Sequence, residues 1–220
     1  MRSFAEIFAI AAERHGGAAA VEAGLSKPKR ATELARVPED RWLAVMSRCI
    51  FQAGFSWKVI EAKWPGFEAA FRGFDPDACA MMDDAWLDRL LTDRGIVRNG
   101  PKIETVRDNA VFITELRAEG GVGKVIGGWP AADYVGLLEM LKVRGSRIGG
   151  ATGQYFLRFS GVDSFILSRD VVARLVAEGV IDKAPGSKRA MAAVQAAFDG
   201  WRAESGRTLT EVSRVLALSI

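Results

Sequence analysis

Apolar residues recur every three or four positions along most of the chain, which is the spacing of one face of an α-helix. Near the N-terminus Phe4, Ile7 and Ala11 follow this spacing, and the helix that they predict ends near residues 16–17. A second apolar stripe begins after Pro38 and predicts a helix that ends at Gly54, because proline favours the first turn and glycine the end.

The same pattern predicts the remaining helices, with proline, serine or aspartate at most of their starts. They are expected over residues 57–63, from 65, from 75–76, from 83–84 to 91, and over 101–119, 133–143, 151–159, 169–178, 187–203 and 208–216. Runs of alternating β-branched residues are absent. The fold class predicted from the pattern is therefore all-α.

Composition narrows the class of protein. The chain has 220 residues, of which 49% are hydrophobic and 26% charged, and these values exclude a disordered or fibrous protein. No apolar run approaches the roughly 20 residues that cross a bilayer. The N-terminus lacks the basic, apolar and small-residue order of a signal peptide, so we expect a cytoplasmic protein without a membrane partner.

Metal and nucleophile chemistry have few candidate residues. The only cysteines are Cys49 and Cys79, and the only histidine is His15. A clustered zinc site or a disulfide framework cannot be built from these three, and His15 has no triad motif around it. We expect no metal and no cofactor.

Charge is distributed unevenly although its net value is only +3. Residues 141–160 contain Lys142, Arg144, Arg147 and Arg158 and no acid, whereas residues 75–93 are strongly acidic. A basic end of this kind favours an anionic partner such as nucleic acid. For the acidic stretch we prefer the simpler interpretation of solvated helix faces.

A glycine-rich turn separates two predicted helices inside the basic region. Gly145, Gly149 and Gly150 flank Arg147, and backbone N–H groups in such a hairpin, followed by a helix N-terminus, form a donor surface for phosphate. Glycine also lets the backbone approach DNA closely. The alternative is an ordinary helix connection with charged neighbours.

Asp163 follows the hairpin after one predicted helix. A carboxylate in this place can stabilise a sugar cation or deprotonate a water, as carboxylates do in glycoside hydrolysis. The alternative is that Asp163 caps a helix, and Asp170 is a weaker candidate for the same role.

Residues 51–57 lie between two predicted helices and present Gln52 and Trp57. A tryptophan ring stacks on a base, and more strongly on a cationic one, while the amide of Gln52 can donate to and accept from a base edge. The alternative is a core position for Trp57.

Three motifs carry a family resemblance. They are the string Q-A-G-F-S-W at residues 52–57, the string F-R-G-F-D-P at residues 71–76 and the string G-I-V-R-N-G-P-K-I at residues 95–103. They resemble DNA-3-methyladenine glycosylase I, of the helix–hairpin–helix DNA glycosylases. The resemblance is clear over residues 49–119 and weaker over 144–163, where Asp163 falls near the superfamily's catalytic aspartate.

The resemblance implies a two-lobed helix–hairpin–helix fold, with the damaged base flipped from double-stranded DNA onto Trp57 and Gln52. It implies hydrolysis of the N-glycosidic bond of alkylated purines such as 3-methyladenine by a monomer. No lysine stands at a nucleophile position, so the expected reaction leaves the DNA strand intact.

The chain also departs from that family. Cys49 stands at the base-contacting position that usually holds glutamate, the residues of a zinc site are missing, and residues 1–36 look unrelated. We therefore divide the chain into an N-terminal helical segment, 1–36, and a glycosylase-like domain, 37–220, whose lobes are discontinuous. A lesion-binding protein without catalysis and a helical protein-interaction module remain as alternatives.

Overall fold

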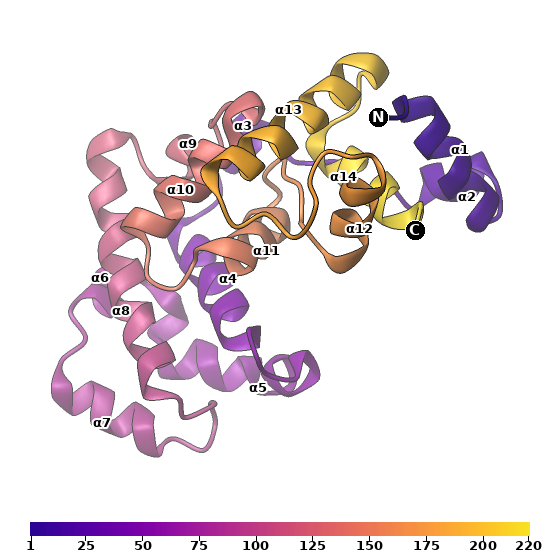
Figure 1. The fold of residues 1–220 in the computed structure, drawn as a ribbon. Coiled ribbons are helices and arrows are strands. Elements are labelled where there is room, and N and C mark those ends of the chain that lie inside the picture. Colours follow the sequence, from indigo (N-terminus) through magenta and orange to yellow (C-terminus); the bar gives the residue numbers. More distant parts are fainter. The chain divides into compact units, whose positions relative to one another are not determined.

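The computed structural model describes residues 1–220, and all regular structure in it is helical, which confirms the predicted all-α class (Figure 1). The chain divides into two compact units. Unit 1 comprises residues 1–29, 130–137 and 161–220, so it contains both ends of the chain, and unit 2 comprises residues 30–129 and 138–160. The division predicted at residue 36 differs from this one, because the first 29 residues pack with residues 161–220.

Unit 1 is built from helices at the two ends of the chain. They are α1 (Phe4–Arg14), α2 (Ala18–Ala23), α12 (Arg169–Ala177), α13 (Lys188–Ser205) and α14 (Leu209–Leu218), with the short 3-10 helix η3 (Ala131–Asp133) and the first residues of α10 (Tyr134–Arg144). Aromatic side chains fill its core, where the rings of Phe165 and Phe198 stack 4.4 Å apart.

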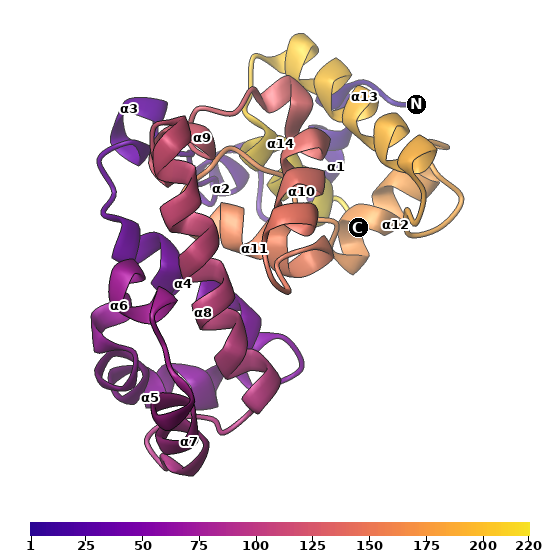
Figure 2. The ribbon, with the colours of Figure 1, turned by 90° about the vertical axis from the view of Figure 1, so that its left-hand side faces the viewer.

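Unit 2 holds the middle of the chain. Its helices are α3 (Ala31–Leu34), α4 (Glu39–Gln52), α5 (Trp57–Ala70), α6 (Pro76–Ala80), α7 (Asp84–Thr92), α8 (Gly100–Glu115), α9 (Val122–Val125), most of α10 and α11 (Gly150–Ser160), with the 3-10 turns η1 (Arg72–Phe74) and η2 (Leu116–Glu119). The long helix α8 packs against both α4 and α6 (Figure 2). Helix α11 crosses α4, where the rings of Trp42 and Phe156 meet edge to face at 6.0 Å.

Most predicted helices are confirmed within one or two residues, and so are the predicted starts at Asp75 and Asp83, whose side chains accept a hydrogen bond from the first turns of α6 and α7. Ser187 and Thr208 cap α13 and α14 in the same way. Three short helices, α2, α3 and α9, were not predicted from the pattern, because four to six residues carry too little apolar periodicity.

One predicted boundary is wrong. Pro65 does not begin a helix but lies inside α5, which continues to Ala70. A proline inside a helix costs about 3 kcal/mol relative to alanine, because it lacks an N–H and crowds the preceding turn. The neighbouring Trp64 offsets this cost, since its ring stacks on Phe67 at 5.4 Å and on Phe74 at 5.3 Å. Tertiary packing therefore overrides local propensity here.

A buried ion pair joins the two ends of the chain within unit 1. The Glu178 carboxylate accepts hydrogen bonds from the Arg2 backbone at 2.7 Å, the Arg2 guanidinium at 2.8 Å and Arg174 Nη1 at 3.2 Å. Arg174 in turn donates to the hydroxyl of Ser219 at 2.8 Å and to its carbonyl. These contacts connect the residue before α1, helix α12 and the end of α14.

Glu178→Gln is expected to lower the free energy of unfolding by about 1–3 kcal/mol at pH 7, because Arg174 loses its buried anionic partner. Burial by itself raises the pKa of Glu178, but the hydrogen bonds from Arg2 and Arg174 hold it below its usual range. Its stabilising effect is therefore complete above the unfolded pKa of about 4.3 and is lost as the pH falls through the folded pKa.

Urea denaturation of both proteins at pH 7 and pH 3.5 tests this. The difference in the free energy of unfolding between the parent and Glu178→Gln should be smaller at pH 3.5 than at pH 7. The control Glu13→Gln, on the exposed face of α1, should leave the free energy of unfolding unchanged at both pH values. An equal loss at both pH values would show that the carboxylate charge does not stabilise the fold.

No helix in this structure is both long and apolar enough to cross a membrane.

Candidate functional site

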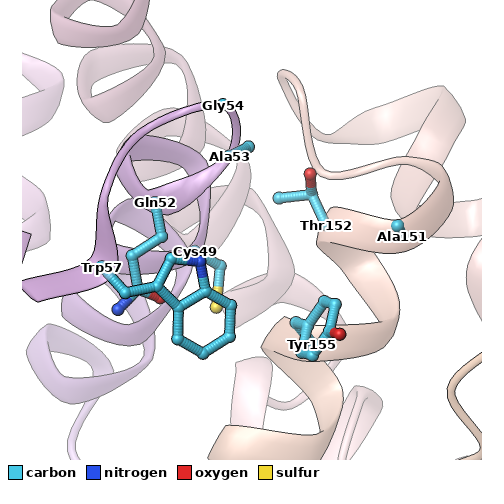
Figure 3. A pocket seen from close by; sticks show the side chains of 8 residues that line it. All are labelled: Cys49, Gln52, Ala53, Gly54, Trp57, Ala151, Thr152 and Tyr155. Carbon is cyan, nitrogen blue, oxygen red and sulfur yellow. The ribbon is translucent and has the colours of Figure 1, made fainter. Parts of the chain in front are cut away.

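A pocket of about 290 Å³ opens in unit 2 (Figure 3). One side comes from the end of α4 and the turn into α5, and the other from the first turns of α11. The residues that line it are Cys49, Gln52, Ala53, Gly54, Trp57, Ala151, Thr152 and Tyr155. Its volume lies just below the roughly 300–1,000 Å³ typical of small-molecule sites, which suits a single planar ring system.

Helix α4 supplies the polar side of the pocket. Cys49 and Gln52 are three residues apart, so they share one helix face, and both are buried. Gln52 Nε2 donates to Glu61 Oε1 at 2.9 Å, and the other carboxylate oxygen of Glu61 lies 3.9 Å from Arg48. The hydrogen bond fixes the orientation of the Gln52 amide and leaves its Oε1 and one N–H for a ligand.

The turn after α4 is held by a lysine from α8. Gly54 has φ +74°, a backbone conformation that favours glycine. Lys102 Nζ donates to the carbonyls of Phe51 at 3.2 Å and Ala53 at 2.5 Å, which satisfies acceptors that the end of α4 leaves unpaired. Burial, with a smaller contribution from Arg147, lowers the pKa of Lys102. The hydrogen bonds from Lys102 therefore fix the turn that leads to Trp57.

Aromatic side chains form the rim. The ring of Trp57 is 45% exposed and meets the rings of Tyr155 and Phe159 edge on, at 5.5 Å and 5.8 Å. Tyr155 and Phe159 are four residues apart on α11, so both face the same way. The exposed faces of this cluster are available to stack on a flat ligand.

Cys49 does not act as an anion in this pocket. It is 4% exposed, and burial raises the pKa of its thiol to about 12. The thiol is therefore neutral at physiological pH and serves as a small, weakly polar surface.

The glycine hairpin between α10 and α11 is anchored to α8. Asn109 Nδ2 donates to the carbonyl of Ser146 at 2.9 Å, and the Ser146 N–H donates to Asn109 Oδ1 at 2.8 Å. The Ser146 hydroxyl also donates to Asp108 at 3.0 Å. Arg147 and Gly150 both have positive φ, 56° and 58°, so the turn is tight and projects the exposed Arg147 side chain outward.

The hairpin glycines have different roles. A Cβ on Gly145 would collide with the side chain of Ile148 and the carbonyl of Leu141, whereas Gly150 has nothing within 4 Å. At Gly149 a Cβ would lie 3.1 Å from Lys142 Cγ and 3.6 Å from its Cα, which is tight but less severe than the collision at Gly145. Gly145 is therefore needed for packing, and substitution there would disturb the fold as well as any phosphate contact.

Asp163 lies in unit 1, in the irregular segment between α11 and α12. Its carboxylate accepts from the N–H of Thr210 at 2.9 Å and from that of Leu209 at 3.2 Å, both in the first turn of α14. It therefore caps the first turn of α14, a helix far along the chain, and not a helix of its own segment, so the capping alternative stays open. It is half-buried and lies at the N-terminal end of α14.

The structure thus brings Cys49, Gln52 and Trp57 together in one pocket and places the hairpin in the same unit. The sequence interpretation missed Tyr155 and Thr152, which complete the pocket wall. The sequence does carry a signal for Tyr155. It lies four positions before Phe159 on the helix after the basic hairpin, and this spacing predicts an aromatic surface on that helix.

No three side chains among His, Cys, Asp and Glu gather closely enough to hold a metal ion. Cys49 and Cys79 are both buried, and the His15 ring contacts the Leu218 carbonyl. These residues do not fit the zinc site that the family resemblance implies.

Comparison with known proteins bears on the same region. Residues 37–127 match the sequence model of the methyladenine glycosylase family, and this span contains Cys49, Gln52 and Trp57. A DNA-3-methyladenine glycosylase 1 of Escherichia coli (strain K12) is 35% identical over 69 residues, which are 31% of this chain and 37% of that protein. The chain therefore matches little more than a third of the length of this curated relative.

Solved structures extend the similarity in fold. A crystal structure of 3-methyladenine DNA glycosylase I superimposes with a TM-score of 0.52 and 24% identity, over 66% of this chain and 87% of that one. The Methanocaldococcus jannaschii 8-oxoguanine glycosylase/lyase, solved with a 15mer DNA containing 8-oxoguanine, gives a TM-score of 0.50 and 17% identity. The superposition covers 84% of this chain and 82% of that one. The resemblance inferred from the sequence is confirmed: residues 37–127 carry the methyladenine glycosylase pattern, and the chain has the fold of the DNA-3-methyladenine glycosylases I.

Proposed function

We propose that this chain is a DNA glycosylase that flips an alkylated purine out of double-stranded DNA and hydrolyses its N-glycosidic bond as a monomer. The observation that carries the proposal is the pocket, whose rim is aromatic and whose α4 wall lies in the methyladenine glycosylase match. A flipped base would stack on Trp57 and hydrogen-bond to Gln52. The names of the relatives, 3-methyladenine DNA glycosylases, support the same substrate class.

The proposed chemistry uses the charge that alkylation places on the purine. The bond between the sugar C1′ and the purine breaks with its electron pair going to the base, which leaves as a neutral molecule. The oxocarbenium-like sugar is stabilised by the carboxylate of Asp163, and a water adds to C1′ and gives its proton to that carboxylate. Two amide N–H groups fix the orientation of this carboxylate.

The same proposal predicts no cleavage of the strand. A bifunctional glycosylase needs an amine that attacks C1′. Lys102 is the buried lysine near the pocket, but its ammonium group donates to the Phe51 and Ala53 carbonyls. It supports the turn and is not placed to act as a nucleophile.

The hairpin is proposed to bind the phosphate backbone through Arg147 and the N–H groups near Gly149 and Gly150. Arg147→Glu is expected to weaken binding to every duplex by a similar factor, because phosphate contacts carry no sequence information. The slope of log affinity against log salt concentration should fall by about 1. Fluorescence anisotropy with damaged and undamaged duplexes, at several salt concentrations, measures both quantities.

A matched control is Arg89→Glu on α7, which changes the net charge equally at an exposed position away from the hairpin. If Arg89→Glu lowers the slope as much as Arg147→Glu, binding depends on net charge alone and the hairpin is only a connection. Gly145→Asp is a poorer variant for this purpose, since a side chain there collides with Ile148.

A lesion-binding protein without catalysis is the second candidate. It is favoured by the pocket itself, because none of its lining side chains is a carboxylate. Two assays separate the candidates: release of free base from methylated duplex DNA, and binding to a duplex with an abasic site. The glycosylase does both, whereas the binder retains only the second.

A further inference from the structure

We propose that the pocket selects bases by the lability of their glycosidic bond and by stacking, so that this enzyme releases cationic N3- and N7-alkylpurines alike and leaves neutral lesions in place. This inference rests on the proposed glycosylase function and specifies its substrate class. It is carried by the chemistry of the eight lining residues, none of which has a charged side chain.

The first step concerns acid catalysis. A neutral damaged base leaves as an anion unless a group in the site protonates it, and an efficient proton donor has a pKa near the working pH. The lining groups that carry a proton are the thiol of Cys49, the hydroxyls of Thr152 and Tyr155, and the amide of Gln52. None is a carboxylic acid or an imidazole, and the proposed mechanism uses Asp163 as an anion beside the sugar, so the pocket offers the base no such donor. Only a base that is already cationic departs as a neutral molecule.

The second step concerns the edge of the base. Adenine derivatives present an amino group at position 6 and guanine derivatives a carbonyl oxygen. The amide of Gln52 has one N–H engaged by Glu61, and its oxygen and second N–H can accept from the amino group or donate to the carbonyl. No fixed carboxylate in the pocket rejects the carbonyl oxygen. The polar contact therefore does not separate the two alkylpurines.

The third step concerns binding energy. Trp57 and Tyr155 supply aromatic faces, and such faces attract a cationic ring without an ion pair. Glu61, which accepts from the lining residue Gln52, is itself paired with Arg48. Attraction to the positive charge therefore comes from stacking, which depends little on which purine nitrogen is alkylated.

The test measures the products released by the full chain from one duplex preparation methylated to carry 3-methyladenine and 7-methylguanine. Three further duplexes carry hypoxanthine, uracil or 8-oxoguanine. We expect rate enhancements over spontaneous loss for the two methylpurines that agree within about tenfold, a barrier difference of about 1.4 kcal/mol. We expect no release of the three neutral bases above background.

Each other outcome is decisive. Release of 3-methyladenine with a preference above about tenfold over 7-methylguanine would overturn the inference and leave the glycosylase proposal standing. Release of a neutral base would also overturn it, because the site would then supply a proton. Release of no base would reject the glycosylase function itself, and the inference with it.

A charge introduced into the pocket gives a second test. Cys49→Glu should raise the ratio of 3-methyladenine to 7-methylguanine release about ten- to a hundredfold, since a carboxylate accepts from the amino group and repels the carbonyl oxygen. Cys49→Gln has the same shape without the charge and should raise the ratio far less. Circular dichroism confirms that both variants fold, and equal ratios in the two folded variants would contradict the role given to charge.

Discussion

Truncation of Trp57 to alanine is expected to lower base release by about 10- to 100-fold, because base–aromatic stacking is worth about 1–3 kcal/mol. It should lower the free energy of unfolding by only about 1–2 kcal/mol. The ring is 45% exposed, and its contacts with Tyr155 and Phe159 are made at their edges. Truncation therefore loses less buried surface than it would at a core tryptophan. Single-turnover kinetics on methylated DNA and urea denaturation measure the two effects separately.

Trp64 on the same helix provides the matched control. It is 8% exposed, stacks on Phe67 and Phe74, and donates from Nε1 to Glu68 at 3.0 Å. Trp64→Ala should cost about 3–5 kcal/mol of stability, the usual loss for a core aromatic residue. If Trp57→Ala destabilises the protein to the same extent, its ring is part of the core and is not a binding surface.

Asp163→Asn is expected to reduce base release by about a hundred- to a thousandfold, as removal of a preorganised electrostatic group does in other enzymes. Asparagine keeps the shape but provides one oxygen where the carboxylate offers two to the N–H groups of Leu209 and Thr210. We therefore also expect a stability loss of about 1 kcal/mol, the size of a lost helix cap. Binding to the lesion should persist.

Asp170→Asn is the control for Asp163. Asp170 lies in the first turn of α12, beside Arg169 at 3.6 Å, and its substitution should change base release little. Loss of stability without loss of turnover in Asp163→Asn would assign Asp163 a structural role only. A loss of turnover in Asp170→Asn instead would move the catalytic carboxylate to that residue.

Local signals explain why the helices were predictable. The stripe after Pro38, the caps Asp75 and Asp83, and the glycine turn after residue 144 all depend on neighbours in sequence. Cys49, Gln52 and Trp57 could be grouped because they lie on one helix face and the adjoining turn. The family motif over residues 52–57 added the interpretation that this group faces a base.

Long-range packing explains what was not predictable. Pro65 stays inside α5 because Trp64 stacks on Phe74, which lies beyond the helix end. Tyr155 reaches the pocket because α11 packs across α4, and the pattern along the chain contains no information on that crossing. The partners of Asp163 are 46 and 47 residues away in sequence, so its contact with α14 could not be inferred from its own segment.

The measurement that tests the central claim most directly is single-turnover incubation of the parent protein with a duplex that carries 3-methyladenine at one position. Free base is separated from the DNA. The length of the DNA strand is then measured both before and after treatment with alkali. The account predicts free 3-methyladenine and a strand that stays intact until alkali cleaves it at the abasic site. Tight binding of the duplex with no release of base would contradict it and would identify the chain as a lesion-binding protein.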